Sequence, residues 1–426
     1  MFKTFVNAWK IEDVRKKILF TFLIIVLYRI GANLPIPFLS SSLETVLNAN
    51  AGSIFSYLNI LSGSAFSQAT LFALGVSPYI TSQIVIQLLT VAIPALERLS
   101  KEEDGRKKID QYTRIGTILL AIITSVGYYF LLKSYNLLTN TGFFAALVIV
   151  TCYCSGSSLV MWLAEKINDY GIGNGVSMIL FANILSRGAS IAGSFWSFLT
   201  NGTVGGVLTA VLGLVIALAM IWFIVFVTES ERRLPIQYAK KVVGRKMYGG
   251  QNSTLPIKVN NVGVMPIIFA SSILSIIPTI GMFVNPAEGS FWAGFFDLFS
   301  SDHWVYIIFS VALIILFAFF YIQISFNPVE VANNLKQNGG FVPGIRPGRP
   351  TAEYIKKILY RVTLIGAICL AVIDIIPLLI NVCSGGAMKG IAFGGTSIII
   401  VVGVILETVR EMEAQMTMRH YKGFLN

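Results

Sequence analysis

The sequence predicts an all-α polytopic membrane protein with ten transmembrane helices in two inverted five-helix halves. Three observations lead to this prediction. Of the 426 residues, 55% are hydrophobic and only 12% are charged, about half the charged fraction of a soluble protein. Ten stretches are mainly apolar over about 20 residues, the length that crosses a bilayer. The basic residues lie between these stretches, on one predicted side of the membrane.

The predicted spans follow one another along the whole chain. They cover approximately 18–36, 70–95, 112–132, 143–165, 174–194, 204–228, 261–284, 304–325, 358–382 and 391–412. The fifth span contains Arg187 and many small residues. A charged side chain inside a membrane is costly, so we expect protein rather than lipid to surround this span.

The loop charges orient the spans. An even number of spans places both termini on one side, and 28 of the 32 Lys and Arg residues then fall on that side. The other four, Arg29, Lys133, Arg187 and Lys389, belong to the opposite side or to the span interiors. Because short cytoplasmic loops are rich in Lys and Arg, we expect both termini in the cytoplasm and the protein in the cell membrane.

The chain divides into an N-terminal half, 1–200, and a C-terminal half, 201–426, with five predicted spans in each. An odd number of spans per half forces the two halves into opposite orientations. Transporters built in this way place their path at the interface between the halves. We therefore expect the functional path to lie between residues of both halves.

Three segments fit no spanning helix. Residues 53–67 (SIFSYLNILSGSAFS) are half apolar and too short to cross. They form either an interfacial half-helix or a re-entrant segment that protein surrounds. The other two are the large predicted cytoplasmic loops, about 230–260 and 326–357. YAKKVVGRKMYGGQ (238–251) predicts a short hairpin, and GGFVPGIRPGRP (339–350) predicts a rigid exposed turn rather than a helix.

Motifs for catalysis or cofactor binding are missing from the sequence. GIGNG (171–175) is a weak dinucleotide signal, because it follows a membrane helix rather than a strand. Cys152 and Cys154 form a C-x-C without the further ligands of a metal site. Asp374 is a lone carboxylate in the ninth span. It is interpreted as a helix-end acid that reaches the interface, with a transported-ion site as the alternative. We expect no catalytic residue, metal or cofactor, and driving energy that comes from a partner or a gradient.

Six segments, in order along the chain, resemble the SecY family of protein-export channels. They are TLFALGVSPYITSQIVIQLLT (70–90), EDGRKKIDQYTR (103–114), GIGNGVSMILFANI (171–184), LPIKVNNVGVMPIIFASSI (255–273), FNPVEVANNLKQNGGFVPGIRPG (326–348) and FGGTSIIIVVGVILE (393–407). The resemblance covers essentially the whole chain. It implies two halves that close like a clamshell around an hourglass pore, which passes unfolded secretory polypeptides and releases membrane segments laterally.

The resemblance also implies the parts of such a channel. It makes 53–67 a re-entrant plug, with Ile54, Phe55, Leu58, Ile60 and Leu61 as its apolar residues. It implies an aliphatic pore ring of Val76, Ile80, Val176, Leu180, Ile268 and Ile400. It implies a lateral gate between the second and seventh spans, with polar positions Thr81, Gln87, Asn260 and Ser272. A signal sequence would part this gate and enter the lipid bilayer.

The two large loops resemble the docking platform of the family. The residues implied are Arg232, Arg233, Lys240, Lys241, Arg245, Lys246 and, within GIRPG, Arg346. The implied partners are the SecA ATPase, the ribosome, the membrane subunits SecE and SecG, and a signal-bearing polypeptide. A small-solute secondary transporter is the alternative, and it would need paired charges or ion ligands at the midplane. An assembly scaffold would need neither a plug nor a ring.

Overall fold

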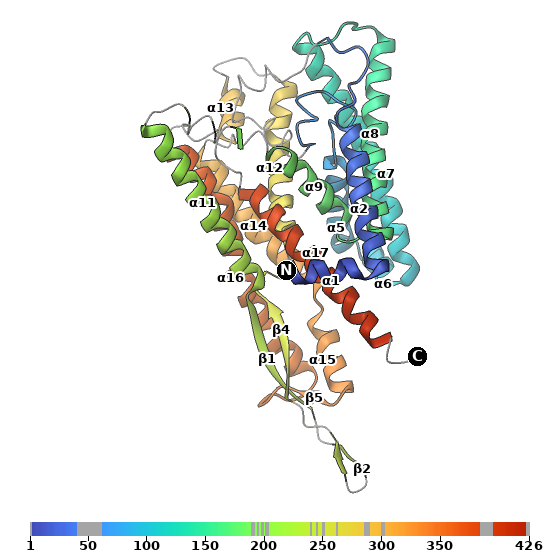
Figure 1. Ribbon diagram of the computed structural model, residues 1–426, viewed down its shortest axis with the longest axis vertical. Helices are drawn as coiled ribbons and strands as arrows, with labels where there is room; N and C mark the ends of the chain where they lie inside the picture. Colours follow the sequence, from blue (N-terminus) through green and yellow to red (C-terminus); the bar gives the residue numbers. More distant parts are fainter. Residues whose placement is uncertain are drawn as a thin grey trace.

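The computed structural model describes residues 2–40, 62–188, 192–193, 196, 200, 204–238, 241–243, 246–248, 252–260, 263–284, 290–299, 303–383 and 395–422. Upright helices form a bundle, and a smaller part with strands projects from one end of it (Figure 1). The first part of the chain, drawn blue to green, occupies one side of the bundle, and α11 to α16 occupy the other (Figure 1).

The N-terminal half contributes seven of the helices described. They are α1 (Phe2–Lys10), α2 (Glu12–Gly31), α5 (Ser77–Ala92), α6 (Pro94–Lys101), α7 (Glu103–Ser134), α8 (Phe143–Tyr170) and α9 (Gly175–Ser186). Helix α7 packs between α5 and α8, and α2 packs on α8 and α9. Proline explains one break, because Pro94 begins α6 where it cannot continue the hydrogen bonds of α5.

The C-terminal half contributes the remaining described helices. They are α11 (Val204–Glu229), α12 (Met265–Val284), α13 (Phe291–Leu298), α14 (Trp304–Ser325), α15 (Pro328–Gln337), α16 (Arg349–Cys383) and α17 (Gly395–Lys422). Helix α14 packs on α12 and α16, while α17 contacts α2 and α9 of the N-terminal half. Asn327 begins α15 by accepting hydrogen bonds from the amides of Val329 and Glu330.

A described helix coincides with each of the ten predicted spans, although the boundaries differ. Five helical stretches of the described chain are long and apolar enough to cross a membrane: Lys107–Ser134, Phe143–Tyr170, Val211–Glu229, Trp304–Gln337 and Arg349–Ile380. A sixth arises if α5 and α6, which meet at 107°, count as one broken span. The apolar stretches within α9 and α12 are shorter. The protein is thus a polytopic helical membrane protein, and the number ten stays a prediction.

Several predicted boundaries were wrong. Helix α2 ends at Gly31 rather than 36, and α5 begins at Ser77 rather than 70, because residues 63–76 form turns and a bridge. Helix α16 begins at Arg349, inside the predicted 326–357 loop, and α15 occupies another part of that loop. Hydropathy marks only the apolar part of a helix, so it missed the polar start of α16.

A small sheet projects from the bundle. Strand β1 (Glu231–Tyr238) pairs antiparallel with β4 (Asn252–Lys258) on one edge and with β5 (Gly340–Phe341) on the other. Strands β2 (Lys241–Val243) and β3 (Lys246–Tyr248) pair as a hairpin, which confirms the hairpin predicted in 238–251. The sequence did not predict the longer, separate pair of β1 and β4 on either side of this hairpin in the chain. The predicted turn in 339–350 is confirmed for residues 343–348.

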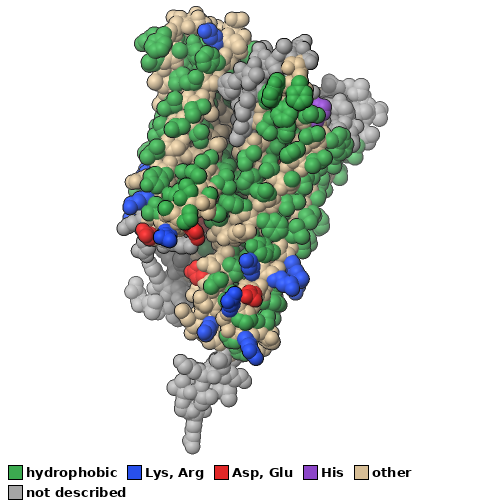
Figure 2. Space-filling view, turned by 180° about the vertical axis from the view of Figure 1, so that it is seen from behind, with side chains coloured by type: hydrophobic (Ala, Val, Ile, Leu, Met, Phe, Trp, Pro, Cys, Tyr) green, Lys and Arg blue, Asp and Glu red, His purple; other side chains and the backbone are tan. Residues whose placement is uncertain are grey.

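The outer face of the bundle is apolar. Side chains such as Phe22, Ile115 and Trp222 are 62–68% exposed, and hydrophobic atoms cover most of the helical part of the face in Figure 2. Most Lys and Arg side chains of that face lie near the end that carries the strands (Figure 2). An apolar belt of this extent suits lipid rather than water.

Candidate functional site

The six predicted ring residues lie in one hydrophobic cluster. Each is between 1% and 8% exposed, and the cluster joins α5, α9, α12 and α17. Val76 is the N-cap of α5 and Ile80 lies in its first turn, while Val176 and Leu180 lie in the first half of α9. Ile268 and Ile400 come from the C-terminal half, on α12 and α17. Side chains that are far apart in the sequence thus form one aliphatic patch between the two halves.

The turn before α9 sets the orientation of Val176 and Leu180. Asn174 caps the helix by accepting a hydrogen bond from the Ser177 amide. The Gly175 amide donates to Asn168 Oδ1 over 2.7 Å. A Cβ at Gly175 would overlap the carbonyl oxygen of Ala164, so glycine lets α8 and α9 approach closely. GIGNG is therefore a packing turn between membrane helices.

Two of the predicted gate residues bury unpaired amide oxygens. Helix α5, which carries Thr81 and Gln87, contacts α12, which carries Ser272, whereas Asn260 lies in the turn between β4 and α12. Gln87 Oε1 and Asn260 Oδ1 are buried without a hydrogen-bond partner among the described residues. Thr81 donates to the carbonyl of Ser77 in its own helix over 3.0 Å, and Ser272 is partly buried on α12. The two buried, unpaired amide oxygens therefore cost stability rather than add it.

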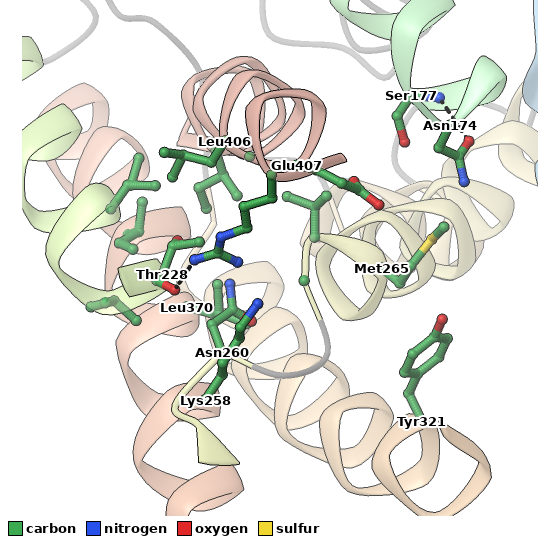
Figure 3. A pocket seen from close by; sticks show the side chains of 18 of the residues that line it. Asn174, Ser177, Thr228, Lys258, Asn260, Met265, Tyr321, Leu370, Leu406 and Glu407 are labelled. Carbon is green, nitrogen blue, oxygen red and sulfur yellow. Dashed lines mark hydrogen bonds between the residues drawn. The ribbon is translucent and has the colours of Figure 1, made fainter. Parts of the chain in front are cut away.

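A cavity of about 610 Å³ opens beside the aliphatic cluster. Asn174 and Ser177 lie on one side of it and Lys258 and Asn260 on another, with Glu407 from α17 between them (Figure 3). Ser177 follows the ring residue Val176, and lining residue Ile399 precedes Ile400. The cavity therefore leads from the polar end of the bundle toward the aliphatic cluster.

Charged groups surround one end of this cavity. Arg410 donates to Glu229 Oε1 over 2.8 Å and to the carbonyl of Thr228 over 3.1 Å. Burial, together with the neighbouring Arg410, lowers the pKa of Lys258 at the end of β4. Arg410 and Lys258 were not predicted as lining residues, because Lys258 belongs to a basic loop and Arg410 to the basic end of the last predicted span.

The predicted plug is described only at its C-terminal end. Ile54, Phe55, Leu58, Ile60 and Leu61 lie outside the described residues. Of 53–67, residues 62–67 are described, and Ala65 belongs to the same hydrophobic cluster as the ring residues. This end of the segment therefore packs against protein, next to the aliphatic patch.

The predicted docking residues lie on the projecting part. Arg232 and Arg233 are exposed on β1, and Arg233 pairs with Glu231. Arg346 is exposed in the turn before α16, where its carbonyl accepts a hydrogen bond from Thr351 Oγ1 over 2.8 Å. Lys241 and Lys246 belong to the β2–β3 hairpin, and Lys240 and Arg245 lie outside the described residues.

Asp374 requires a correction. Its carboxylate accepts hydrogen bonds from Ser310 Oγ over 3.0 Å and from Thr396 Oγ1 over 2.8 Å. It therefore joins α14, α16 and α17 instead of reaching the interface as a helix-end acid. Hydropathy could not reveal this, because the two hydroxyl partners are 64 and 22 residues away.

The described cysteines Cys152, Cys154 and Cys369 are free, and the described part of the chain holds no metal-ligand cluster.

The sequence is similar to known proteins along its whole length. A family model described as SecY matches residues 70–409. Two relatives described as "Protein translocase subunit SecY", from Streptomyces galbus and Mycobacterium tuberculosis, are each 42% identical, over 442 and 446 residues. In both cases the alignment covers all of this chain and all of the relative.

Solved structures share the fold. One described as "The structure of a protein conducting channel" matches with a TM-score of 0.68 and 18% identity, over 94% of this chain and 92% of that one. "Sec61 in the Canine ribosome-channel complex from the endoplasmic reticulum" matches with a TM-score of 0.61 and 16% identity, over the same shares.

Proposed function

This chain belongs to the SecY family, and on that premise we propose that it is the central subunit of a protein-conducting channel. It passes unfolded secretory polypeptides across the cytoplasmic membrane and releases membrane segments laterally into it. The observation that supports this proposal is the aliphatic cluster that residues of both halves build beside a cavity of about 610 Å³. The small-solute transporter finds no support, since the relatives are translocase subunits and the matched structures are channels.

The six ring residues form the seal of this channel. Apolar walls exclude water, and ions do not cross a constriction that stays dry. Side chains of Val, Ile and Leu also offer no fixed hydrogen-bonding site. The ring therefore accepts polypeptides of any sequence and closes again when they have passed.

The contact between α5 and α12 forms the lateral gate. The amide oxygens of Gln87, on α5, and of Asn260, in the turn between β4 and α12, are buried without a partner among the described residues. An unsatisfied buried polar atom costs about 1–3 kcal/mol. The closed gate is thus kept only marginally stable, so an apolar signal helix can part it.

The projecting sheet and turn form the docking platform for cytoplasmic partners. Arg232 and Arg346 are exposed there, and positive side chains attract acidic proteins and RNA phosphates. We assign this surface to the SecA ATPase and the ribosome. SecE and SecG complete the membrane part, and both termini face the cytoplasm.

Reconstitution tests the proposal. Liposomes that contain the purified chain with SecE are supplied with SecA, ATP and a signal-bearing precursor. We expect protease-protected precursor inside the liposomes, and none without ATP. A preparation that fails, while an established SecY preparation succeeds in parallel, refutes the function.

A further inference from the structure

Residues 62–69 include the C-terminal end of the proposed plug and the first of the turns that lead to α5. Backbone that is not helical at membrane depth needs protein partners for its polar groups, because lipid offers none. Three carbonyl groups of this stretch, those of Gly63, Phe66 and Ala69, find such partners on three different helices.

Each partner is a long side chain of the N-terminal half. Tyr128 on α7 donates its hydroxyl to the carbonyl of Phe66 over 2.5 Å. Tyr153 on α8 donates to Ala69 over 3.5 Å, and Arg29 Nη1 on α2 donates to Gly63 over 3.5 Å. The bond from Tyr128 is the short central contact, and the other two flank it.

The donors are themselves held in place. Tyr128 and Tyr153 are almost fully buried and pack edge to face with ring centroids 4.9 Å apart. Arg29 Nη2 also donates to the carbonyl of Ala182 over 2.5 Å and to Asn183 Oδ1 over 3.2 Å, near the end of α9. Such fixed donors define one position for the backbone of 63–69 rather than a range of positions.

The backbone of this stretch is strained in a way that requires support. Ser64 has φ of 73° and Ala69 has φ of 49°, values that side-chain-bearing residues rarely adopt. Strain of this kind persists only when the surroundings hold it. Here, Phe66 packs on Tyr128 with ring centroids 4.8 Å apart, and the Phe66 amide donates to Ser62 Oγ over 3.0 Å.

We propose that Arg29, Tyr128 and Tyr153 are positioning residues that fasten the C-terminal end of the plug to the N-terminal half in every gating state. All three donors and all three acceptors lie within residues 1–200, so parting of the two halves breaks none of these bonds. The stretch 62–69 therefore keeps its place on the N-terminal half when the two halves part. This inference rests on the proposed function, since it takes 53–67 as the plug.

Removal of a single hydroxyl tests the anchor. The complete channel, with SecE and SecG, is reconstituted in planar bilayers, and its resting ion conductance is compared for wild type, Tyr128→Phe and Tyr129→Phe. Tyr129 is the matched control, because it is equally buried but donates to the carbonyl of Thr141 instead. We expect Tyr128→Phe to raise the resting conductance about three- to twenty-fold, the effect of one membrane hydrogen bond, and Tyr129→Phe to leave it unchanged. Equal conductance of Tyr128→Phe and wild type overturns the proposal.

A plug deletion separates failure of the anchor from failure of the plug. In a channel that lacks residues 55–61, Tyr128→Phe should add no further conductance, because its target is gone. If Tyr128→Phe raises the ion conductance equally in channels with and without residues 55–61, Tyr128 acts elsewhere. The proposed anchor is then overturned, while the plug assignment stands. If the deletion alone leaves the conductance of the wild type unchanged, the plug assignment falls and the anchor falls with it.

Photo-crosslinking tests the anchor without removing any of its bonds. Benzoylphenylalanine at Phe66 should crosslink to α7 at rest and equally when a precursor is stalled in the channel. Loss of the α7 adduct in the stalled complex would show that 62–69 leaves its position, which contradicts the proposal.

Discussion

Glu411 on α17 accepts a hydrogen bond from the backbone amide of Gly173, with 2.8 Å between Oε2 and the nitrogen. The bond joins the C-terminal half to the GIGNG turn of the N-terminal half. Gln415 donates to the other carboxylate oxygen over 3.2 Å and itself accepts a bond from Lys17 over 3.3 Å. A short polar chain therefore connects the halves beside the cavity.

Glu411→Ala should lower the free energy of unfolding by about 1–2 kcal/mol, because it leaves the Gly173 amide without its charged acceptor. Thermal unfolding in detergent measures the change. Glu353→Ala is the control, since Glu353 takes part only in an exposed pair with Arg349 and should cost less than 0.5 kcal/mol. Equal losses in the two variants would mean that the link between the halves adds no stability.

Gly175→Ala should destabilise the protein by about 1–3 kcal/mol or more, since its new Cβ overlaps the carbonyl oxygen of Ala164 and separates α8 from α9. Gly188→Ala provides the comparison, because no described residue beyond its neighbours in the chain comes within 4 Å of the Cβ it adds. The unfolding midpoints of the two variants measure the difference in their stability. The close approach of the helices is unimportant if both variants unfold like the wild type.

Leu180→Ser should raise the resting ion conductance several-fold, because a hydroxyl in the proposed ring favours water in the constriction. Ile314→Ser is the matched variant: Ile314 is equally buried in the same cluster but lies on α14, outside the six ring residues. Both variants remove buried apolar volume, at a cost of about 2–5 kcal/mol. Bilayer conductance distinguishes them, and an equal leak would remove Leu180 from the ring.

Gln87→Leu and Asn260→Leu should each stabilise the closed gate by about 1–3 kcal/mol, because each replaces a buried, unpaired amide oxygen with an apolar group. Precursors with weakly hydrophobic signals should then cross less well, while strong signals are unaffected. Gln83→Leu, a partly buried glutamine of the same helix, is the control. Translocation of precursors whose signals increase stepwise in hydrophobicity measures the lowest hydrophobicity that opens the gate. If this threshold is the same in the variants and the wild type, the contact is not the gate.

Arg346→Glu should weaken the binding of SecA and of ribosomes about tenfold, because it reverses a charge in the exposed turn before α16. Arg361→Glu, exposed on α16 itself, should have little effect. Flotation of proteoliposomes with each partner measures the binding. Equal weakening in both variants would indicate general attraction to basic charge rather than docking at the turn.

The sequence determined the membrane class, the approximate place of the helices that overlap the predicted spans, and the hairpin in 238–251. These features are local: a run of about 20 apolar residues specifies a span wherever it occurs, and loop residues specify their own turns. The same logic located the exposed turn at Arg346. Boundaries such as the start of α16 at Arg349 were not predicted, because a helix can continue into polar sequence without an apolar signal.

The tertiary structure alone decided which of many similar residues meet. Val76, Val176, Ile268 and Ile400 look like any other aliphatic residue in a chain that is 55% hydrophobic, and only packing gathers them in one cluster. The bonds of Asp374, of Glu411 to Gly173 and of Tyr128 to Phe66 likewise join residues 22 to 238 positions apart. Periodicity reports which face of a helix is apolar, but contacts between elements depend on how the helices are arranged, and no local pattern records that arrangement.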